Sequence, residues 1–406
     1  MRCTSNLVLT LVVPCLAVLA PAAALPAQAA QAAQTAVADQ LPEPTADCPG
    51  GASPAAAPKT TPWAQQALSF SSVWGQTQGA GVTVAVIDSG VDANPQFGDR
   101  VTVGPDLSTG SFGIETGADC VGHGTAVASI IAAAPMGGNK FSGVAPQASI
   151  LSIKITNAET GIPNDTIVTA IRDAVEAGAG VINLSLAAGN TPALQSAVQF
   201  AEASNVVVVA AAGNDNSPGV SQGVVYPAAY PGVLSVGEVE QDGSLGSLSD
   251  TDTPVSVTAP GVGVTGAYPG AYPDAYSTDD TGTSFATAFV SGVAALVRSA
   301  YPSLTAAQVV ERIATTADGA AGPGTGNGMV NPVQAVTAVL PELGKAPGTV
   351  GRRVPVARAA PANTRPRTIA LSIAAAALAA GLLAIAAVLV IPAARRRRHG
   401  LDPGPT

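Results

Sequence analysis

The sequence predicts an α/β fold with a central, mostly parallel sheet, and three observations lead to this fold class. Apolar segments of strand length alternate along the chain with helical segments, an order that produces a parallel sheet. The strand segments are continuous Val/Ile runs, as in strands that are buried on both faces. The chain has 406 residues, of which 47% are hydrophobic and 11% charged, so it can fill a large core.

Each expected element follows from its own apolar pattern. The runs rich in Val and Ile are the expected strands: Val82–Ile87, Ile150–Ile155, Val181–Leu186, Val206–Ala210, Val233–Val236 and Val255–Thr258. The helical segments between and after them are Gly124–Ala134, Asn164–Ala177, Thr191–Ala203, Ser284–Ala300 and Thr305–Ala317. Thr305 is the expected N-cap of the last helix, and Gly319 is expected to end it.

Charge is distributed unevenly along the chain. The formal net charge is −9, but nine of the 18 Lys and Arg residues lie within 352–398. Residues 60–345 hold 23 Asp and Glu against seven Lys and Arg, a net charge of −16. Such a body repels a phosphate backbone, so nucleic acid is excluded as a partner. The chain has two histidines, His123 and His399, and this count excludes a His-rich zinc site.

Residues 1–30 have the parts of a secretory signal peptide. Arg2 supplies the positive start, residues 7–20 form an apolar run, and residues 22–30 contain small residues suited to cleavage. An uncleaved anchor is the alternative, but the run is short and Pro14 interrupts it. We therefore expect the body of the protein to be exported.

Residues 369–391 are expected to form one transmembrane helix. They are 23 uncharged residues, which extend roughly 35 Å as a helix and so can cross a bilayer core; a buried soluble helix is the alternative. Arg395 to Arg398 follow as a basic cytoplasmic flank. We expect a single-pass protein of the cell membrane, with an extracytoplasmic body and with residues 392–406 as a cytoplasmic tail.

Three segments lie between the two membrane signals. Residues 31–60 are rich in Ala, Pro and Gln and are expected to form an extended arm. Residues 61–342 hold the predicted sheet, and residues 343–368 are a Pro/Arg-rich stalk. Removal of the signal peptide leaves Cys48 and Cys120, which suggest one disulfide in an exported protein, with two free thiols as the alternative.

Three motifs place a polar residue at the end of a predicted element, where parallel sheets carry functional residues. They are Asp88 in VTVAVIDSGVD, His123 in DCVGHGTAVASII and Ser284 in DDTGTSFATAFVSGVAALV. Each alone has an ordinary structural explanation: a turn residue, a surface or core histidine, and a helix N-cap. Together they supply the carboxylate, base and nucleophile that serine-dependent amide hydrolysis needs, in the order Asp, His, Ser. That order differs from the orders in other serine hydrolase folds.

From about residue 63 to 340 the chain resembles the subtilisin-like serine proteases. The segments GVAPQASILSIKI (143–155), VINLSL (181–186) and VVVVAAAGNDN (206–216) add to the three motifs. The resemblance implies a subtilisin-like fold, with Asp88, His123 and Ser284 as the catalytic triad and Asn214 as a donor in the oxyanion hole. It also implies a substrate-binding surface made of Ser185, Leu186, Ala187, Ala211, Ala212 and Gly213.

Within this group the chain resembles the mycosins, membrane-anchored subtilases attached to type VII secretion systems. The signal peptide, the Pro-rich arm, a cysteine three residues before His123, the GTSFA box and the terminal membrane helix all agree. In that family the arm wraps the domain and is tied by a disulfide, which implies the pair Cys48–Cys120. Ala288 is a departure, because subtilases usually have proline in this first turn after the nucleophile.

The expected function is that of an exported, membrane-anchored serine endopeptidase. Its substrates are proteins or peptides, its chemistry needs no cofactor or metal, and the resemblance implies a type VII secretion membrane complex as partner. The alternative is a structural scaffold of that complex, with proteolysis secondary.

Overall fold

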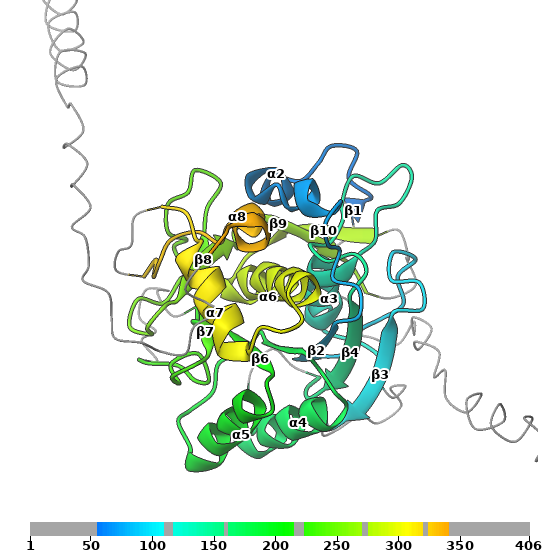
Figure 1. Ribbon diagram of the computed structural model, residues 1–406. Helices are drawn as coiled ribbons and strands as arrows, with labels where there is room; N and C mark the ends of the chain where they lie inside the picture. The colour runs from blue at the N-terminus through cyan, green and yellow to red at the C-terminus, as the bar shows by residue number, and fades with distance from the viewer. Residues whose placement is uncertain are drawn as a thin grey trace, which may run out of the picture. The chain divides into compact units, whose positions relative to one another are not determined.

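A computed structural model describes residues 55–108, 117–157, 161–214, 223–269, 275–319 and 324–340 (Figure 1). The predicted signal peptide, most of the arm with Cys48, the stalk, the membrane helix and the cytoplasmic tail lie outside these residues.

A seven-stranded sheet forms the centre of the fold, and its neighbouring strands all pair in parallel. Side by side, the strands are β3 (Val101–Asp106), β4 (Ser149–Lys154), β2 (Thr83–Asp88), β5 (Val181–Leu184), β6 (Val207–Ala211), β7 (Leu234–Val239) and β8 (Val257–Pro260). This arrangement confirms the predicted α/β class. The chain adds β3 and β4 on one side of β2 and the later strands on the other. The crevice between β2 and β5 is therefore a topological switch point, where such sheets bind ligands.

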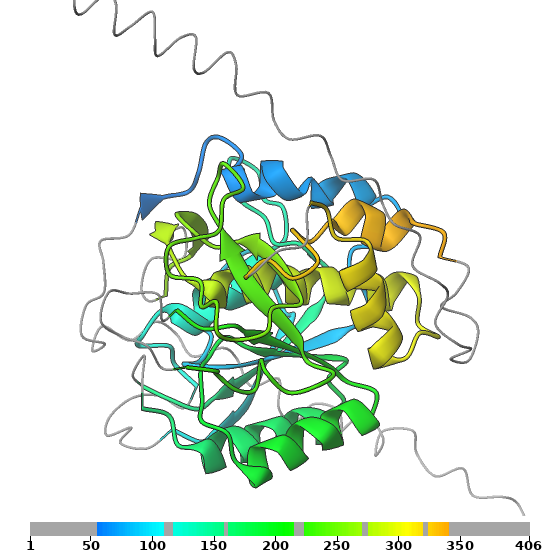
Figure 2. The same cartoon turned by 90° about the vertical axis from the view of Figure 1, so that its left-hand side faces the viewer.

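Helices cover both faces of the sheet (Figures 1 and 2). One face carries α4 (Asn164–Glu176) and α5 (Pro192–Ala203). The other face carries α3 (His123–Ala132) and α6 (Thr283–Ala300). The shorter helices lie on the α6 side in Figure 2: α2 (Trp63–Leu68), the 3₁₀-helix η1 (Phe70–Val73), α7 (Ala306–Thr315) and α8 (Pro332–Thr337).

Six strands of the central sheet are buried on both faces, as their continuous apolar runs predict, whereas the edge strand β3 is partly exposed. Along β2, Val84 and Val86 belong to the core beneath α3 and α6, whereas Ala85 and Ile87 belong to the core beneath α4 and α5. The helix α6 is long and apolar enough to cross a membrane, but 78% of it is buried inside the domain. It is the core helix of this fold, and its amino-terminal end carries Ser284.

Several elements were missed because their sequences carry weak patterns. A second sheet is antiparallel and contains β1 (Ala55–Ala56), β10 (Ala275–Asp280) and β9 (Val264–Ala267). The strands of this second sheet are short or polar. In the central sheet the edge strand β3 was also missed, because it ends in a Gly-Pro-Asp sequence. Ala55, near the end of the predicted arm, pairs with Tyr276 of β10. Thr305 is confirmed as an N-cap, since it forms a capping box with Gln308.

Candidate active site

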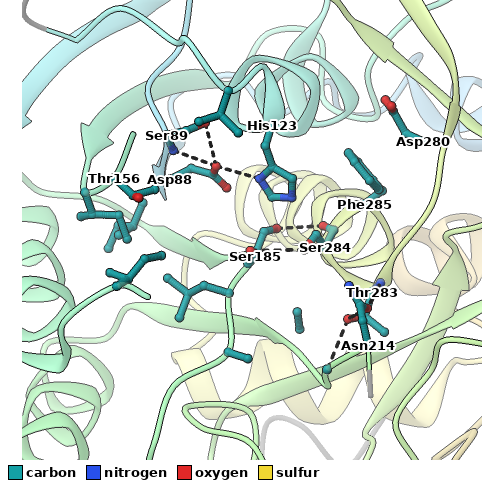
Figure 3. A pocket seen from close by; sticks show the side chains of 18 of the residues that line it. Asp88, Ser89, His123, Thr156, Ser185, Asn214, Asp280, Thr283, Ser284 and Phe285 are labelled. Atoms are coloured by element: carbon teal, nitrogen blue, oxygen red, sulfur yellow. Dashed lines mark hydrogen bonds and ion pairs between the residues drawn. The ribbon is translucent and has the colours of Figure 1, made fainter. Parts of the chain in front are cut away.

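The three predicted catalytic residues meet at the carboxyl end of the sheet, at the crevice between β2 and β5. Asp88 ends β2, His123 begins α3, and Ser284 is the second residue of α6. All three line one pocket of about 570 Å³ (Figure 3). Five other predicted site residues and the predicted oxyanion donor line it too: Ser185, Leu186, Ala187, Ala211, Gly213 and Asn214.

Asp88 and His123 form a hydrogen-bonded pair. The Nδ1 atom of His123 lies 2.8 Å from Oδ1 of Asp88, which also accepts the Ser89 amide at 2.8 Å. Close approach of α3 to β2 depends on the glycine after the histidine. A Cβ atom on Gly124 would lie 2.1 Å from the carbonyl oxygen of Gly90, which no side chain permits. The glycine at position 124 is therefore a steric requirement for the pairing of His123 with Asp88.

A second buried carboxylate, Asp119, holds the beginning of α3 in place. The helix starts after Gly122, which has no side chain to cap it, so Asp119 accepts the Gly122 amide at 2.8 Å. It also accepts the amide and hydroxyl of Thr125, at 2.8 and 2.7 Å, and the hydroxyl of Ser89 at 2.8 Å. The sequence interpretation missed Asp119, although a carboxylate just before a helix start is a capping signal.

The surroundings of His123 favour its protonated form. Burial lowers the pKa of His123, but the charge of Asp88 and its hydrogen bond raise it, as do the charges of Asp119 and Asp280. The result is a pKa of about 9. The Phe285 ring packs beside the imidazole, with 5.3 Å between ring centroids. A base in this environment holds the proton that it receives from a serine hydroxyl.

Ser284 is tied to the end of β5. Its hydroxyl donates to the carbonyl oxygen of Ser185 at 3.2 Å, and the Ser185 hydroxyl donates to the Ser284 carbonyl at 2.8 Å. Asn183 donates to the Ser185 hydroxyl at 3.0 Å and so helps to orient that hydroxyl toward the Ser284 carbonyl. The Ser284 hydroxyl thus points toward Ser185 rather than His123. Catalytic hydrogen bonds are often completed only when substrate binds.

Asn214 is oriented by the helix that carries Ser284. Its Oδ1 atom accepts the amide of Thr283 at 2.9 Å and the Thr283 hydroxyl at 2.8 Å. Because the side-chain amide is planar, these two bonds also set the direction of its NH₂ group. A Cβ atom on Gly282, whose φ is 149°, would lie 3.0 Å from that nitrogen. Thr283 and Gly282 are thus parts of the site that motif reasoning left unassigned.

The remaining predicted residues have different outcomes. Ala212 is buried and does not line the pocket, because its amide continues the sheet by donating to Val236. Cys120 is disulfide-bonded. Its predicted partner, Cys48, lies outside the described residues, so that pairing stays a prediction. The described part of the chain contains no group of three or more His, Cys, Asp or Glu side chains that could hold a metal ion.

A family model described as the subtilase family matches residues 79–336, and the chain belongs to that family. It is a subtilisin-like serine protease. Mycosin-4 of Mycobacterium tuberculosis is 37% identical over 381 residues, covering 82% of each chain. Subtilisin DY of Bacillus licheniformis is 40% identical over 242 residues, or 59% of this chain and 85% of that protein.

Solved structures agree with this family. The chain resembles the serine protease MycP1, described as an essential component of the type VII (ESX-1) secretion system, with a TM-score of 0.60 and 30% identity. That match covers 73% of this chain and 95% of MycP1.

Proposed function

We propose that this protein is an exported, membrane-anchored serine endopeptidase that hydrolyses peptide bonds in secreted proteins. One observation carries the catalytic part of the proposal. The Asp88–His123 pair, with 2.8 Å between Oδ1 and Nδ1, shares a pocket with a serine at the beginning of a core helix.

Ser284 is the nucleophile, His123 the base, and Asp88 the residue that orients the imidazole. Rotation of the Ser284 hydroxyl from the Ser185 carbonyl toward His123 precedes attack on the substrate carbonyl. His123 then takes the hydroxyl proton and later gives it to the leaving amine, while Asp88 stabilises the imidazolium. The Asn214 amide and the Ser284 backbone N–H donate to the oxyanion, and no cofactor takes part.

The acyl half of the substrate adds as a strand along Ser185, Leu186 and Ala187. These residues follow β5 at the pocket. An extended peptide on such an edge gains backbone hydrogen bonds, while its side chains enter neighbouring pockets. Ala211 and Gly213 line the pocket with little side-chain bulk, so they leave room for the side chain before the scissile bond.

A fluorophosphonate probe tests the nucleophile. The probe should label the wild-type full chain on Ser284, and Ser284→Ala should abolish the labelling. Ser196→Ala is the matched control, because it removes an exposed serine hydroxyl of α5 outside the pocket and keeps the nucleophile. Equal labelling of Ser284→Ala and the wild type would refute the assignment.

Export and anchoring complete the proposal. Residues 1–30 act as signal peptide, 61–342 as peptidase domain, 369–391 as transmembrane helix and 392–406 as cytoplasmic tail. An epitope tag placed after residue 406 should resist added protease in intact cells, whereas the peptidase domain should be exposed to it. A tag that is digested in intact cells would overturn this topology.

The covalent link of the arm to the domain has its own test. Mass spectrometry without reductant should show peptides containing Cys48 and Cys120 joined to each other. Detection of Cys48 as a free thiol in the exported protein would refute the pairing.

A scaffold role in a type VII secretion complex is the second candidate function. It is favoured by the similarity to MycP1, which is described as an essential component of such a system. Secretion should be compared in the native host between a deletion strain and a Ser284→Ala strain. If secretion persists with Ser284→Ala and fails in the deletion, the scaffold role is supported. Equal loss in both strains would exclude it.

A further inference from the structure

An asparagine interrupts the apolar run of a central strand, and the proposed mechanism does not use it. Asn183 lies in β5 between the buried residues Ile182 and Leu184, and its own side chain is fully buried. β2 and β6 flank β5 on its two sides, so this position lies in the interior of the sheet. A buried amide without hydrogen-bond partners destabilises a fold, so a polar residue here requires partners within the core.

Both ends of the Asn183 amide are hydrogen-bonded to buried serines. Its Oδ1 atom accepts the Ser291 hydroxyl at 2.8 Å, and its NH₂ group donates to the Ser185 hydroxyl at 3.0 Å. Ser291 lies seven residues after Ser284, or two turns along α6, so both serines lie on the helix face that meets β5. The amide therefore connects the middle of α6 to the contact between Ser185 and Ser284 at its start.

The direction of each hydrogen bond in this chain follows from the groups involved. A serine hydroxyl has one proton to donate. The Ser185 hydroxyl gives its proton to the Ser284 carbonyl oxygen at 2.8 Å, so it can only accept from the amide beneath it. The NH₂ group of Asn183 is such a donor, and the bond from Ser291 to Oδ1 favours the amide orientation that presents it. An oxygen in that place would compete with the Ser284 carbonyl for the Ser185 proton.

This chain of hydrogen bonds matters most when Ser284 reacts. Two bonds join Ser185 and Ser284, one from the Ser284 hydroxyl to the Ser185 carbonyl and one from the Ser185 hydroxyl to the Ser284 carbonyl (Figure 3). In the proposed mechanism the Ser284 hydroxyl turns toward His123, which breaks the first bond. The second bond then still ties the main chain of Ser284 to the end of β5. Misplacement of a reacting group by about 1 Å can lower a rate ~10²-fold.

We propose that Asn183 and Ser291 are positioning residues for the nucleophile. They keep the Ser185 hydroxyl directed at the Ser284 carbonyl, so the main chain of the nucleophile stays in place while its hydroxyl turns to the base. This inference rests on the proposed function, since it assumes attack by Ser284. It extends the support of the nucleophile to two buried residues that do not line the pocket.

The rate of fluorophosphonate labelling of the full chain tests this proposal. The rate constant measures the reactivity of Ser284, whereas the final labelled fraction measures how much of the protein is folded. Asn183→Leu keeps the number of side-chain heavy atoms without a hydrogen-bonding group. It should lower the rate constant about tenfold and leave the final fraction unchanged. Ser291→Ala should lower the rate constant about threefold, because Asn183 keeps its bond to Ser185 but loses the bond that orients its amide.

A double-mutant cycle separates positioning from a general loss of stability. In a Ser185→Ala background, Asn183→Leu should not lower the rate constant further, because Asn183 acts through the missing hydroxyl. Thr77→Val is the matched control. It removes a buried hydroxyl that donates to the Leu296 carbonyl at 3.2 Å, near the other end of α6, and should keep the wild-type rate constant.

The outcomes distinguish this inference from the proposed function. A wild-type rate constant in Asn183→Leu, or equal slowing by this change with and without the Ser185 hydroxyl, would overturn the positioning role and leave the proposed function standing. If Asn183→Leu yields no protein that can be labelled, Ser291→Ala decides, and a wild-type rate constant in that variant would overturn the positioning role. A wild-type protein that is not labelled on Ser284 would overturn the proposed function and this inference together.

Discussion

Glu238 allows a quantitative test of the electrostatics beneath the nucleophile helix. It lies in β7, is fully buried, and neither of its carboxylate oxygens has a hydrogen-bond partner of normal geometry among the described residues. Burial raises the pKa of Glu238 to about 7 from the ordinary value of 4.5, although the nearby amides of Leu248 and Gly282 lower it in part. The folded protein therefore keeps this proton at pH values where the unfolded chain has lost it.

The sign and size of the effect follow from this difference. Between pH 4.5 and about 7, unfolding releases the Glu238 proton, so the free energy of unfolding falls as pH rises. Each pH unit costs about 1.4 kcal/mol, so the loss over the whole window is roughly 3 kcal/mol. Glu238→Gln keeps the shape without the charge. It should match the wild type at pH 5 and exceed its stability by up to roughly 3 kcal/mol at pH 8.

Urea unfolding at pH 5 and pH 8 measures this difference, with Ser284→Ala in every protein to prevent self-cleavage. Glu311→Gln is the matched control, because this glutamate is exposed on α7 and should leave the pH dependence unchanged. Equal losses in the free energy of unfolding between pH 5 and pH 8, with glutamate or with glutamine at position 238, would refute this prediction.

Three further predictions concern catalysis. Asn214→Ala should lower kcat about 10²–10³-fold with little change in KM, the usual cost of losing one oxyanion donor; unchanged steady-state kinetics would exclude that role. Because His123 must be unprotonated to act as base, kcat/KM should rise with pH toward its pKa of about 9. The charge of Asp280 raises the pKa of His123, so Asp280→Asn should move the rise in kcat/KM to lower pH. An unchanged pH profile would contradict the electrostatic coupling between Asp280 and His123. Gly124→Ala should push α3 away from Gly90, abolish fluorophosphonate labelling and destabilise the fold by about 1–3 kcal/mol; normal labelling and thermal unfolding would refute the steric requirement.

The parallel sheet could be predicted because its evidence is local. A strand buried on both faces must be apolar at every position, so runs such as 82–87 and 206–210 indicate strands without knowledge of their neighbours. The second sheet lacked such a signal. Its strand β10 has the sequence AYSTDD, whose polar end is half-buried or exposed, and pairing with β9 stabilises it. Tertiary pairing, rather than local pattern, decides strands of this kind.

By itself the sequence determined the α/β class and the three motifs that bear Asp88, His123 and Ser284, because each signal is contained in one continuous segment. Only the tertiary structure decided what surrounds these motifs. The Ser284 hydroxyl bonds a residue 99 positions away, and Asn214 is held by Thr283, 69 positions along the chain. The place of Asp280 across His123 likewise depends on β10 pairing with β9, the strand that contacts α3. Hydrogen bonds and charges act through space, so contacts between distant segments leave no periodic pattern in the sequence.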